Sequence, residues 1–324
     1  MKKNLQLLWC LGAVLPLTMC QTSNELMPAG TLVAHEPAAD ALLSAARQHV
    51  AQNKLSAAED NLERIIRRYE NAPCVPEARF LLAEVYEKQG VPRDAFDEYD
   101  KIVTRYQSSP LYAKALDKQM ALAMAAAEGD LKVSVLGMWK SNLDSTTVEE
   151  WLTKVINNAP YNDMAATATS LLGKFLVKRE KFEEAAMVYS KLVEDYPTSR
   201  YAPEAQLMVA QLWATSRTRG DQNLVNLRRA QEAYEEFTLR FPGHADAGKA
   251  LSEASNMRRL LVRQELEVGR YYLERSKEYT SAIFCFENVI RQKKDNAEAA
   301  KEAQQLLARA RSLQAAQNAK TKKS

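Results

Sequence analysis

From residue 38 onward, the chain repeats one arrangement of small, apolar and polar positions. Each copy has a first stretch with small residues at helical spacing, a short turn, a second stretch containing an alanine, and a loop with aromatic residues or proline. Apolar residues that recur every three or four positions predict amphipathic helices. Recurrence of the whole unit at about 34 residues or slightly more predicts that these helices form pairs stacked in a row.

The clearest copy covers residues 170–197. Gly173 and Ala185 are small, so the two helices of this pair can approach closely at these positions. Tyr189 and Leu192 lie three residues apart and therefore share one helix face. We expect these two side chains to fill the space against the next helix pair.

The whole pattern predicts six helix pairs and a final capping helix. The pairs are expected at about residues 40–73, 76–109, 111–127 with 146–158, 170–197, 202–215 with 224–240, and 246–276 with 279–292, and the cap at 296–316. The third pair is interrupted by an insertion, residues 131–145, that is apolar for a loop. Its apolar residues, which either pack on the array or bind a partner, are Val133, Val135, Leu136, Met138 and Trp139.

Residues 170–197 resemble the consensus of the tetratricopeptide repeat nearly position for position. The matching residues are Leu172, Gly173, Leu176, Phe182, Ala185, Tyr189, Leu192 and Pro197. The resemblance implies an all-α fold, a right-handed superhelical solenoid of about six helix pairs with a C-terminal capping helix. We expect the solenoid over residues 38–316, with an N-terminal half at 38–200 and a C-terminal half at 201–316, followed by a basic polar tail at 317–324.

The composition agrees with a helical protein. The chain has only 10 Gly and 11 Pro among its 324 residues, and 46% of its residues are hydrophobic, enough to bury a core. Alternating runs rich in Val, Ile and Thr, which are typical of strands, are missing. The formal net charge is only +3. A nucleic-acid partner is therefore not expected, because domains that bind nucleic acids normally carry a strong basic excess.

Residues 1–19 have the parts of a bacterial export signal. Lys2 and Lys3 form the basic end, and the apolar stretch that follows is too short for a convincing membrane span. Residues 20–37 have no helical period and contain proline and glycine, so we expect a flexible tether there.

The end of this signal resembles a lipobox, the motif in which a cysteine receives a lipid. Leu17 and Cys20 fit the motif, whereas Met19 departs from the small residue that is usual before the cysteine. Gln21 is not the aspartate associated with retention at the inner membrane. We therefore expect lipidation of Cys20 and a location at the periplasmic face of the outer membrane. The alternative is an ordinary signal peptide and a soluble periplasmic protein.

A more specific resemblance covers residues 217–292. An Arg/Asp loop precedes a helix with the pattern Ala-x-x-x-Tyr-x-x-Phe and an aromatic-Pro pair, and a long helix and an Ala-Ile-x-x-Phe helix follow. The long helix ends in a motif made of Glu267, Tyr271, Tyr272 and Arg275. This stretch resembles the BamD (YfiO) family of outer-membrane assembly lipoproteins.

The resemblance implies a non-catalytic envelope scaffold. Members of this family contact the periplasmic domains of the barrel-assembly protein BamA and help to deliver unfolded outer-membrane proteins. The chain departs from the family by one extra residue between Tyr272 and Tyr279, by the insertion at 131–145, and by a sixth helix pair. The alternative function is that of another envelope scaffold built on the same repeats, for cell division, pilus assembly or secretion.

The first helices of a curved solenoid line its concave face. Counting from the small residue of each first helix predicts a groove for an extended peptide on this face. The candidate residues are Leu43, Arg47, Phe80, Glu84, Glu87 and Lys114. Phe80 is the strongest candidate, because solvation does not explain an exposed aromatic ring on a groove. The alternative is an ordinary solvated helix face with local ion pairs.

A second candidate surface, for docking a partner protein, consists of Arg258, Arg259 and Arg263 on the long helix. Glu265 and Glu267 follow these basic residues on the same helix, so the alternative is that the side chains form the solvated side of that helix.

The sequence predicts no catalytic, metal or cofactor chemistry. His35, His49 and His244 lack the spacing of metal ligands, and no phosphate-binding loop, dinucleotide fingerprint or hydrolase motif occurs. We therefore expect no enzymatic activity, no cofactor and no small-molecule substrate. Cys74 and Cys285 lie in different predicted repeats, and we do not expect a disulfide between them.

Overall fold

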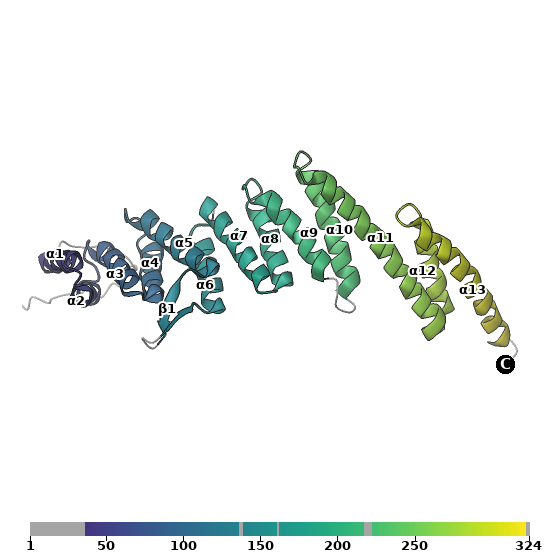
Figure 1. The fold of residues 1–324 in the computed structure, drawn as a ribbon, viewed down its shortest axis with the longest axis horizontal. Helices are drawn as coiled ribbons and strands as arrows, with labels where there is room; N and C mark the ends of the chain where they lie inside the picture. Colours follow the sequence, from purple (N-terminus) through teal and green to yellow (C-terminus); the bar gives the residue numbers. More distant parts are fainter. Residues whose placement is uncertain (1–35, 136–138, 161, 217–221, 322–324) are drawn as a thin grey trace, which may run out of the picture.

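The computed structural model describes residues 36–135, 139–160, 162–216 and 222–321. Within these ranges, thirteen α-helices follow one another in a single elongated row, from α1 at one end to α13 at the other (Figure 1). Each helix packs mainly on the helices before and after it along the chain. The predicted stacking of helix pairs is confirmed.

The six pairs and the cap have the following bounds. The first three pairs are α1 (Pro37–Ala51) with α2 (Leu55–Arg68), α3 (Val75–Gln89) with α4 (Pro92–Arg105), and α5 (Tyr112–Glu128) with α6 (Ser145–Asn158). The next three are α7 (Asp163–Lys178) with α8 (Phe182–Asp195), α9 (Ala202–Thr215) with α10 (Gln222–Arg240), and α11 (Ala247–Tyr271) with α12 (Tyr279–Arg291). The capping helix is α13 (Ala297–Thr321).

Local sequence explains where helices begin and end. Pro92 occupies the first turn of α4, where its missing N–H is not needed for a hydrogen bond. Gly90 ends α3 with a φ of 75°, a left-handed conformation that glycine adopts without strain. Asp144 caps α6, because its carboxylate accepts a hydrogen bond from the backbone N–H of Thr147 at 2.9 Å. Short turns join the two helices of the first pair and of the second pair.

The core runs along the row between successive helices. The small residues at the pair contacts are fully buried, as at Ala58 and Ala95. Large side chains fill the spaces beside them, and Phe96 stacks on Trp151 with the ring centroids 4.3 Å apart. None of the helices in the described ranges has an apolar stretch long enough to cross a membrane.

The insertion in the third pair forms a structure that the sequence did not predict. Strand β1 (Lys132–Val135) pairs antiparallel with β2 (Trp139–Asn142), with Val133 opposite Ser141. Each strand has only four residues, too few for an alternating pattern to stand out from a loop. The side chains of residues 133–140, which include the apolar residues of the insertion, lie outside the described part.

The long helix of the sixth pair is interrupted in its last turn. It continues from α11 into a π-helix, η2 (Tyr272–Ser276). Gly269 in α11 faces the ring of Phe286 in α12, seventeen residues later, whereas Gly173 faces Tyr189 after sixteen. A turn closed by i→i+5 hydrogen bonds holds one more residue than an α-turn. The π-turn therefore takes up the extra residue noted before Tyr279.

The capping helix is longer than predicted. It continues to Thr321, five residues beyond the predicted end at residue 316, so the expected polar tail at 317–324 begins inside a helix. The added turn contains Ala319 and no proline or glycine, so nothing in its sequence stops the helix.

Candidate functional site

Two grooves open on the side of the array formed by the first helices. The first, here called the N-terminal groove, lies between α1, α3 and the loop before α5 and has a volume of about 690 Å³. Its lining residues are Arg47, Pro73, Pro76, Glu77, Phe80, Leu81, Glu84, Tyr106, Ser108, Ser109, Pro110 and Leu111. The floor is largely apolar and the charged residues come from the helices.

Three of the six predicted groove residues come together here, namely Arg47, Phe80 and Glu84. Arg47 of α1 forms an ion pair with Glu77 of α3 across the groove. Glu84 has no hydrogen-bond or ion-pair partner among the described residues. The groove thus combines one neutralised pair with one unpaired carboxylate.

The aromatic wall of this groove is held from behind. The ring of Phe80 meets that of Tyr99 edge to face, with the centroids 5.3 Å apart. The Tyr99 hydroxyl donates a hydrogen bond to Glu87 at 2.5 Å, and Lys118 donates to the same carboxylate at 3.0 Å. Burial raises the pKa of Tyr99 well above its usual range, and its hydrogen bond to Glu87 raises it further. The hydroxyl therefore stays protonated and keeps the ring in place.

The other three predicted groove residues lie elsewhere. The prediction for Leu43 is wrong, because its side chain is only 4% exposed and lies in the core with Ala39 and Ala46, four and three residues away on the same helix face. Glu87 is held by Tyr99 and Lys118 behind the groove instead of lining it. Lys114 is exposed on α5 and does not line the groove either.

Sequence reasoning missed the residues that loops contribute. Pro73, Tyr106, Pro110 and Leu111 belong to the connections between pairs, and helical periodicity does not locate loop residues. The aromatic and proline residues of these loops were the one sequence signal that could have indicated their place in the groove.

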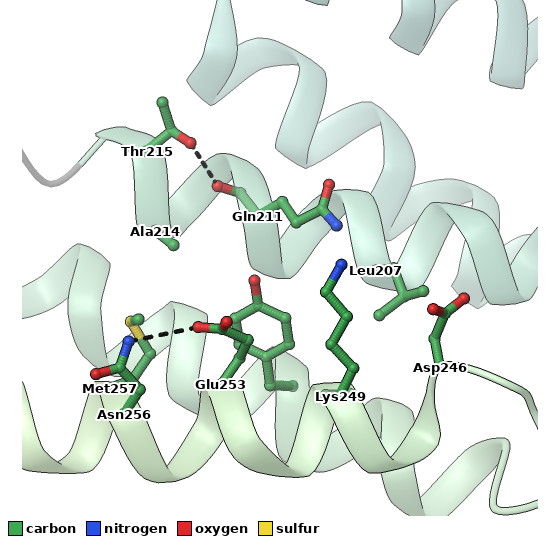
Figure 2. A pocket seen from close by; sticks show the side chains of 11 residues that line it. Leu207, Gln211, Ala214, Thr215, Asp246, Lys249, Glu253, Asn256 and Met257 are labelled. Carbon is green, nitrogen blue, oxygen red and sulfur yellow. Dashed lines mark hydrogen bonds between the residues drawn. The ribbon is translucent and has the colours of Figure 1, made fainter.

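The second groove, here called the C-terminal groove, lies between α9 and α11 and has a volume of about 670 Å³. Figure 2 shows its two walls, with Leu207, Gln211, Ala214 and Thr215 on α9 facing the side chains of α11. The remaining lining residues are Tyr234 of α10 and Asp246, Lys249, Ala250, Glu253, Asn256 and Met257 at the start of and along α11. No residue of this groove was predicted as a site.

Polar and apolar side chains contribute about equally to the lining of the C-terminal groove. The Lys249 side chain extends from α11 toward α9, next to Gln211 (Figure 2), and has no ion-pair partner among the described residues. Glu253 accepts a hydrogen bond from Asn256 at 3.4 Å. Burial, and then the nearby Glu253 carboxylate, raise the pKa of Tyr234. Carboxamides and a free ammonium can hydrogen-bond the backbone of an extended chain.

The predicted docking arginines mostly connect neighbouring helices. Arg258 lies 3.5 Å from Glu235 of α10, and Arg263 pairs with Glu302 of α13 at 2.9 Å. Arg259 is exposed and donates a hydrogen bond to Asn256 at 2.9 Å. Of the three, Arg259 is the one whose side chain is directed to solvent without an ion pair in the described residues.

The residues of the BamD-like motif lie at the end of α11 and in η2. Glu267 pairs with Arg263 and Arg270 on its own helix. Tyr271 is 60% exposed and its ring meets that of Tyr272 edge to face at 6.0 Å. The Arg/Asp loop at 217–221 lies outside the described residues.

Several other predictions also fall outside the described residues. These are the export signal at 1–19, Cys20, and the tether up to residue 35. In the described part, no group of three or more His, Cys, Asp or Glu side chains is arranged to hold a metal ion. Cys74 and Cys285 are free thiols.

Comparisons with known proteins bear on the repeats. Residues 32–110 and residues 171–199 each match a family described as "Tetratricopeptide repeat". No curated protein matches the chain.

Solved structures similar to the chain include several tetratricopeptide-repeat proteins. A thermophilic protein of this kind from Thermus thermophilus, TTC0263, is 18% identical, with 67% of this chain and 98% of that chain covered and a TM-score of 0.28. PilF of Pseudomonas aeruginosa is 15% identical, with 82% and 96% covered and a TM-score of 0.29. A tetratricopeptide repeat protein from Parabacteroides merdae is 13% identical, with 84% and 100% covered and a TM-score of 0.31. At these TM-scores the structures do not superpose on the chain as a whole.

The two family matches cover the pairs α1–α2 and α3–α4 and most of the pair α7–α8. The remaining pairs continue the same row of packed helices. The chain is therefore a mainly helical array that contains tetratricopeptide repeats, a scaffold suited to protein–protein interaction.

Proposed function

We propose that this chain is a non-catalytic scaffold of the bacterial envelope that binds partner and client proteins while β-barrel proteins are assembled into the outer membrane. The observation that carries the binding role is the pair of open grooves lined by the first helices. A groove of several hundred Å³ with an apolar floor and a few convergent polar groups is the usual form of a site for an extended segment.

The assembly role is supported by the BamD-like stretch at 217–292. Most of this stretch is α10, α11 and α12, and its exposed Tyr271 and Arg259 are available to a partner. By the resemblance, the partners are the periplasmic domains of a BamA-like protein and unfolded outer-membrane proteins. By the same resemblance, the N-terminal repeats bind clients, and the C-terminal helices bind the machinery.

Affinity purification of the native chain from envelope membranes tests the assembly role. We expect a BamA-like protein to co-purify. Recovery of cell-division, pilus or secretion proteins without it would reject the assignment and favour the second candidate, another envelope scaffold. The hairpin at 132–142 and the sixth helix pair favour that candidate, because they are additions to the family pattern.

The location at the membrane has its own test. We propose that the lipid on Cys20 anchors the array at the periplasmic face of the outer membrane. Mass spectrometry of the mature N-terminus is expected to find a lipidated Cys20. An unmodified cysteine, or cleavage at another position, would leave the chain soluble in the periplasm.

A further inference from the structure

The N-terminal groove has an apolar floor that nothing in the described chain covers. Phe80 and Leu81 of α3 are only half-buried, and Pro76, Pro110 and Leu111 lie beside them. Large apolar side chains that stay accessible in a concave site gain free energy when an apolar group of a partner enters. The floor therefore selects a segment with at least one bulky apolar side chain.

The charges around this floor are not balanced. Among the described residues that line the groove, Arg47 is the single cation, and it already pairs with Glu77. Glu84, which comes from the same helix as Phe80, keeps its carboxylate without a partner among the described residues. A cation entering the groove is attracted to Glu84, whereas an entering carboxylate is repelled by Glu84 and finds Arg47 occupied.

The groove is also held in shape before a partner arrives. The Phe80 ring is fixed against Tyr99, whose hydroxyl is bound by Glu87, and Glu87 is bound by Lys118. A rigid wall loses little conformational entropy on binding, so the selectivity set by Glu84 is not averaged out by movement of the floor.

We infer that the N-terminal groove binds an internal, extended protein segment in which a bulky apolar residue is followed closely by Lys or Arg, and that it discriminates against a chain end with a free carboxylate. The inference rests on the proposed function, since it names the kind of client segment that the scaffold takes. The apolar residue packs on Phe80 and Leu81, and the cation pairs with Glu84.

Peptide binding to the purified full chain tests this inference. The probes are fluorescent peptides with blocked ends that contain one Phe in a Ser/Thr background, followed two positions later by Lys, Gln or Glu. A fourth peptide ends in Phe with a free carboxylate. We expect the Lys peptide to bind about fivefold more tightly than the Gln peptide, the order expected for one partly exposed ion pair. The Glu and free-carboxylate peptides should bind more weakly than the Gln peptide.

Variants separate the contribution of the Glu84 carboxylate to peptide binding from that of the Phe80 ring. Glu84→Gln is expected to remove the preference for Lys while the Gln peptide binds as before. Phe80→Ala, or Phe80→Leu if the first variant does not fold, should weaken all four peptides. Glu183→Gln, which removes an exposed carboxylate on the second helix α8, outside both grooves, is the matched control and should change none of them. Raising the salt concentration should shrink the Lys preference.

Equal binding of the Lys and Glu peptides, or a Lys preference that survives Glu84→Gln, would overturn the inference. This failure is distinct from failure of the proposed function. If a BamA-like protein co-purifies but the peptides show no charge preference, only the client chemistry assigned here is wrong. If the groove prefers the Lys peptide but no BamA-like protein co-purifies, the assembly role is wrong and the inference about the client segment is supported.

Discussion

Gly173 of α7 lies directly against the ring of Tyr189 in α8. A Cβ atom at this glycine would lie 2.5 Å from the nearest ring carbon, closer than real Cβ contacts come. The ring cannot easily move away, because Tyr189 is only 2% exposed and lies in the core between helix pairs. The absence of a side chain at Gly173 therefore sets how closely the two helices of the fourth pair approach.

We expect Gly173→Ala to destabilise the chain by about 1–2 kcal/mol. Overpacking of a core contact costs about 1–3 kcal/mol, and the better helix propensity of alanine offsets up to about 1 kcal/mol of this. Urea unfolding followed by circular dichroism measures the difference. Gly248→Ala in α11 is the control, because nothing lies within 4 Å of a Cβ there, and it should be neutral or stabilising. Equal stability of the Gly173→Ala variant and the parent would contradict this packing account.

Asp144 gives a prediction about pH. The backbone N–H and then the hydroxyl of Thr147, with a further contribution from Arg93, lower the pKa of Asp144 from 3.8 to about 2. A carboxylate with a lowered pKa stabilises the fold above the pKa of the unfolded chain, and this contribution is lost as the pH falls toward about 2. We expect Asp144→Ala to cost about 1 kcal/mol at neutral pH, as for other N-caps.

The decrease in unfolding free energy caused by Asp144→Ala should become smaller between pH 4 and pH 2. This window lies between the ordinary pKa of 3.8 and the lowered pKa of about 2. Thermal unfolding at a series of pH values measures it. Asp144→Asn is the control, since asparagine caps a helix but does not titrate. A cost that stays constant across this window would show that the charge of Asp144 makes no contribution.

The π-turn η2 predicts that one residue can be removed there. Ser276 is exposed. Deleting it reduces the sequence separation of Gly269 and Phe286 from seventeen to sixteen residues, which is the separation of Gly173 and Tyr189. The turn can then close as an α-turn. We expect a folded chain with a change in unfolding free energy of about 1 kcal/mol or less.

The comparison for this deletion is the removal of Lys191, an exposed residue inside α8. Deleting it rotates the remainder of α8 by roughly 100° and turns Leu192 away from the core, so the fourth pair should not fold. Hydrogen exchange of α8 and α12 distinguishes the two outcomes. If both deletions unfold their pairs to the same extent, the π-turn does not act as the site of an extra residue.

Arg79 and Glu98 form an ion pair at 2.6 Å between α3 and α4, with their side chains only 9% and 10% exposed. Lys101 contacts the same carboxylate at 2.5 Å. We expect Arg79→Met to cost about 3–5 kcal/mol, because it leaves a buried carboxylate short of a partner. The double variant Arg79→Met/Glu98→Gln should recover much of this loss. A double-mutant cycle in urea measures the coupling, and simple additivity of the two changes would contradict it.

The regular part of the fold followed from spacing in the sequence. Small residues such as Gly173 and Ala185 and the large Tyr189 recur at helical periods, and burial of one helix face enforces those periods. The same reasoning failed for Leu43, because a position one turn from Ala39 and Ala46 belongs to the core face of α1. Periodicity assigns a face to a residue, but which neighbours cover that face depends on the next pair.

The candidate site was predictable only in its helical half. Arg47, Phe80 and Glu84 were found because they lie on first helices, whereas Tyr106 and Pro110 come from a loop whose course no period describes. The C-terminal groove was missed because Gln211, Lys249 and Asn256 resemble any polar helix surface in sequence. These residues line one groove because of the spacing between α9 and α11, which is set by helix packing and not by the local sequence.

The central claim is that partner proteins bind on the side of the first helices. Photo-crosslinking in living cells tests it most directly, with a photoreactive amino acid at Ser108 in the N-terminal groove, at Gln211 in the C-terminal groove, or at Met187, which is 59% exposed on the second helix α8. We predict crosslinks from Ser108 and Gln211 to a BamA-like protein or to unfolded β-barrel proteins, and none from Met187. Crosslinks to these proteins from Met187 alone, or equally from all three positions, would contradict the account.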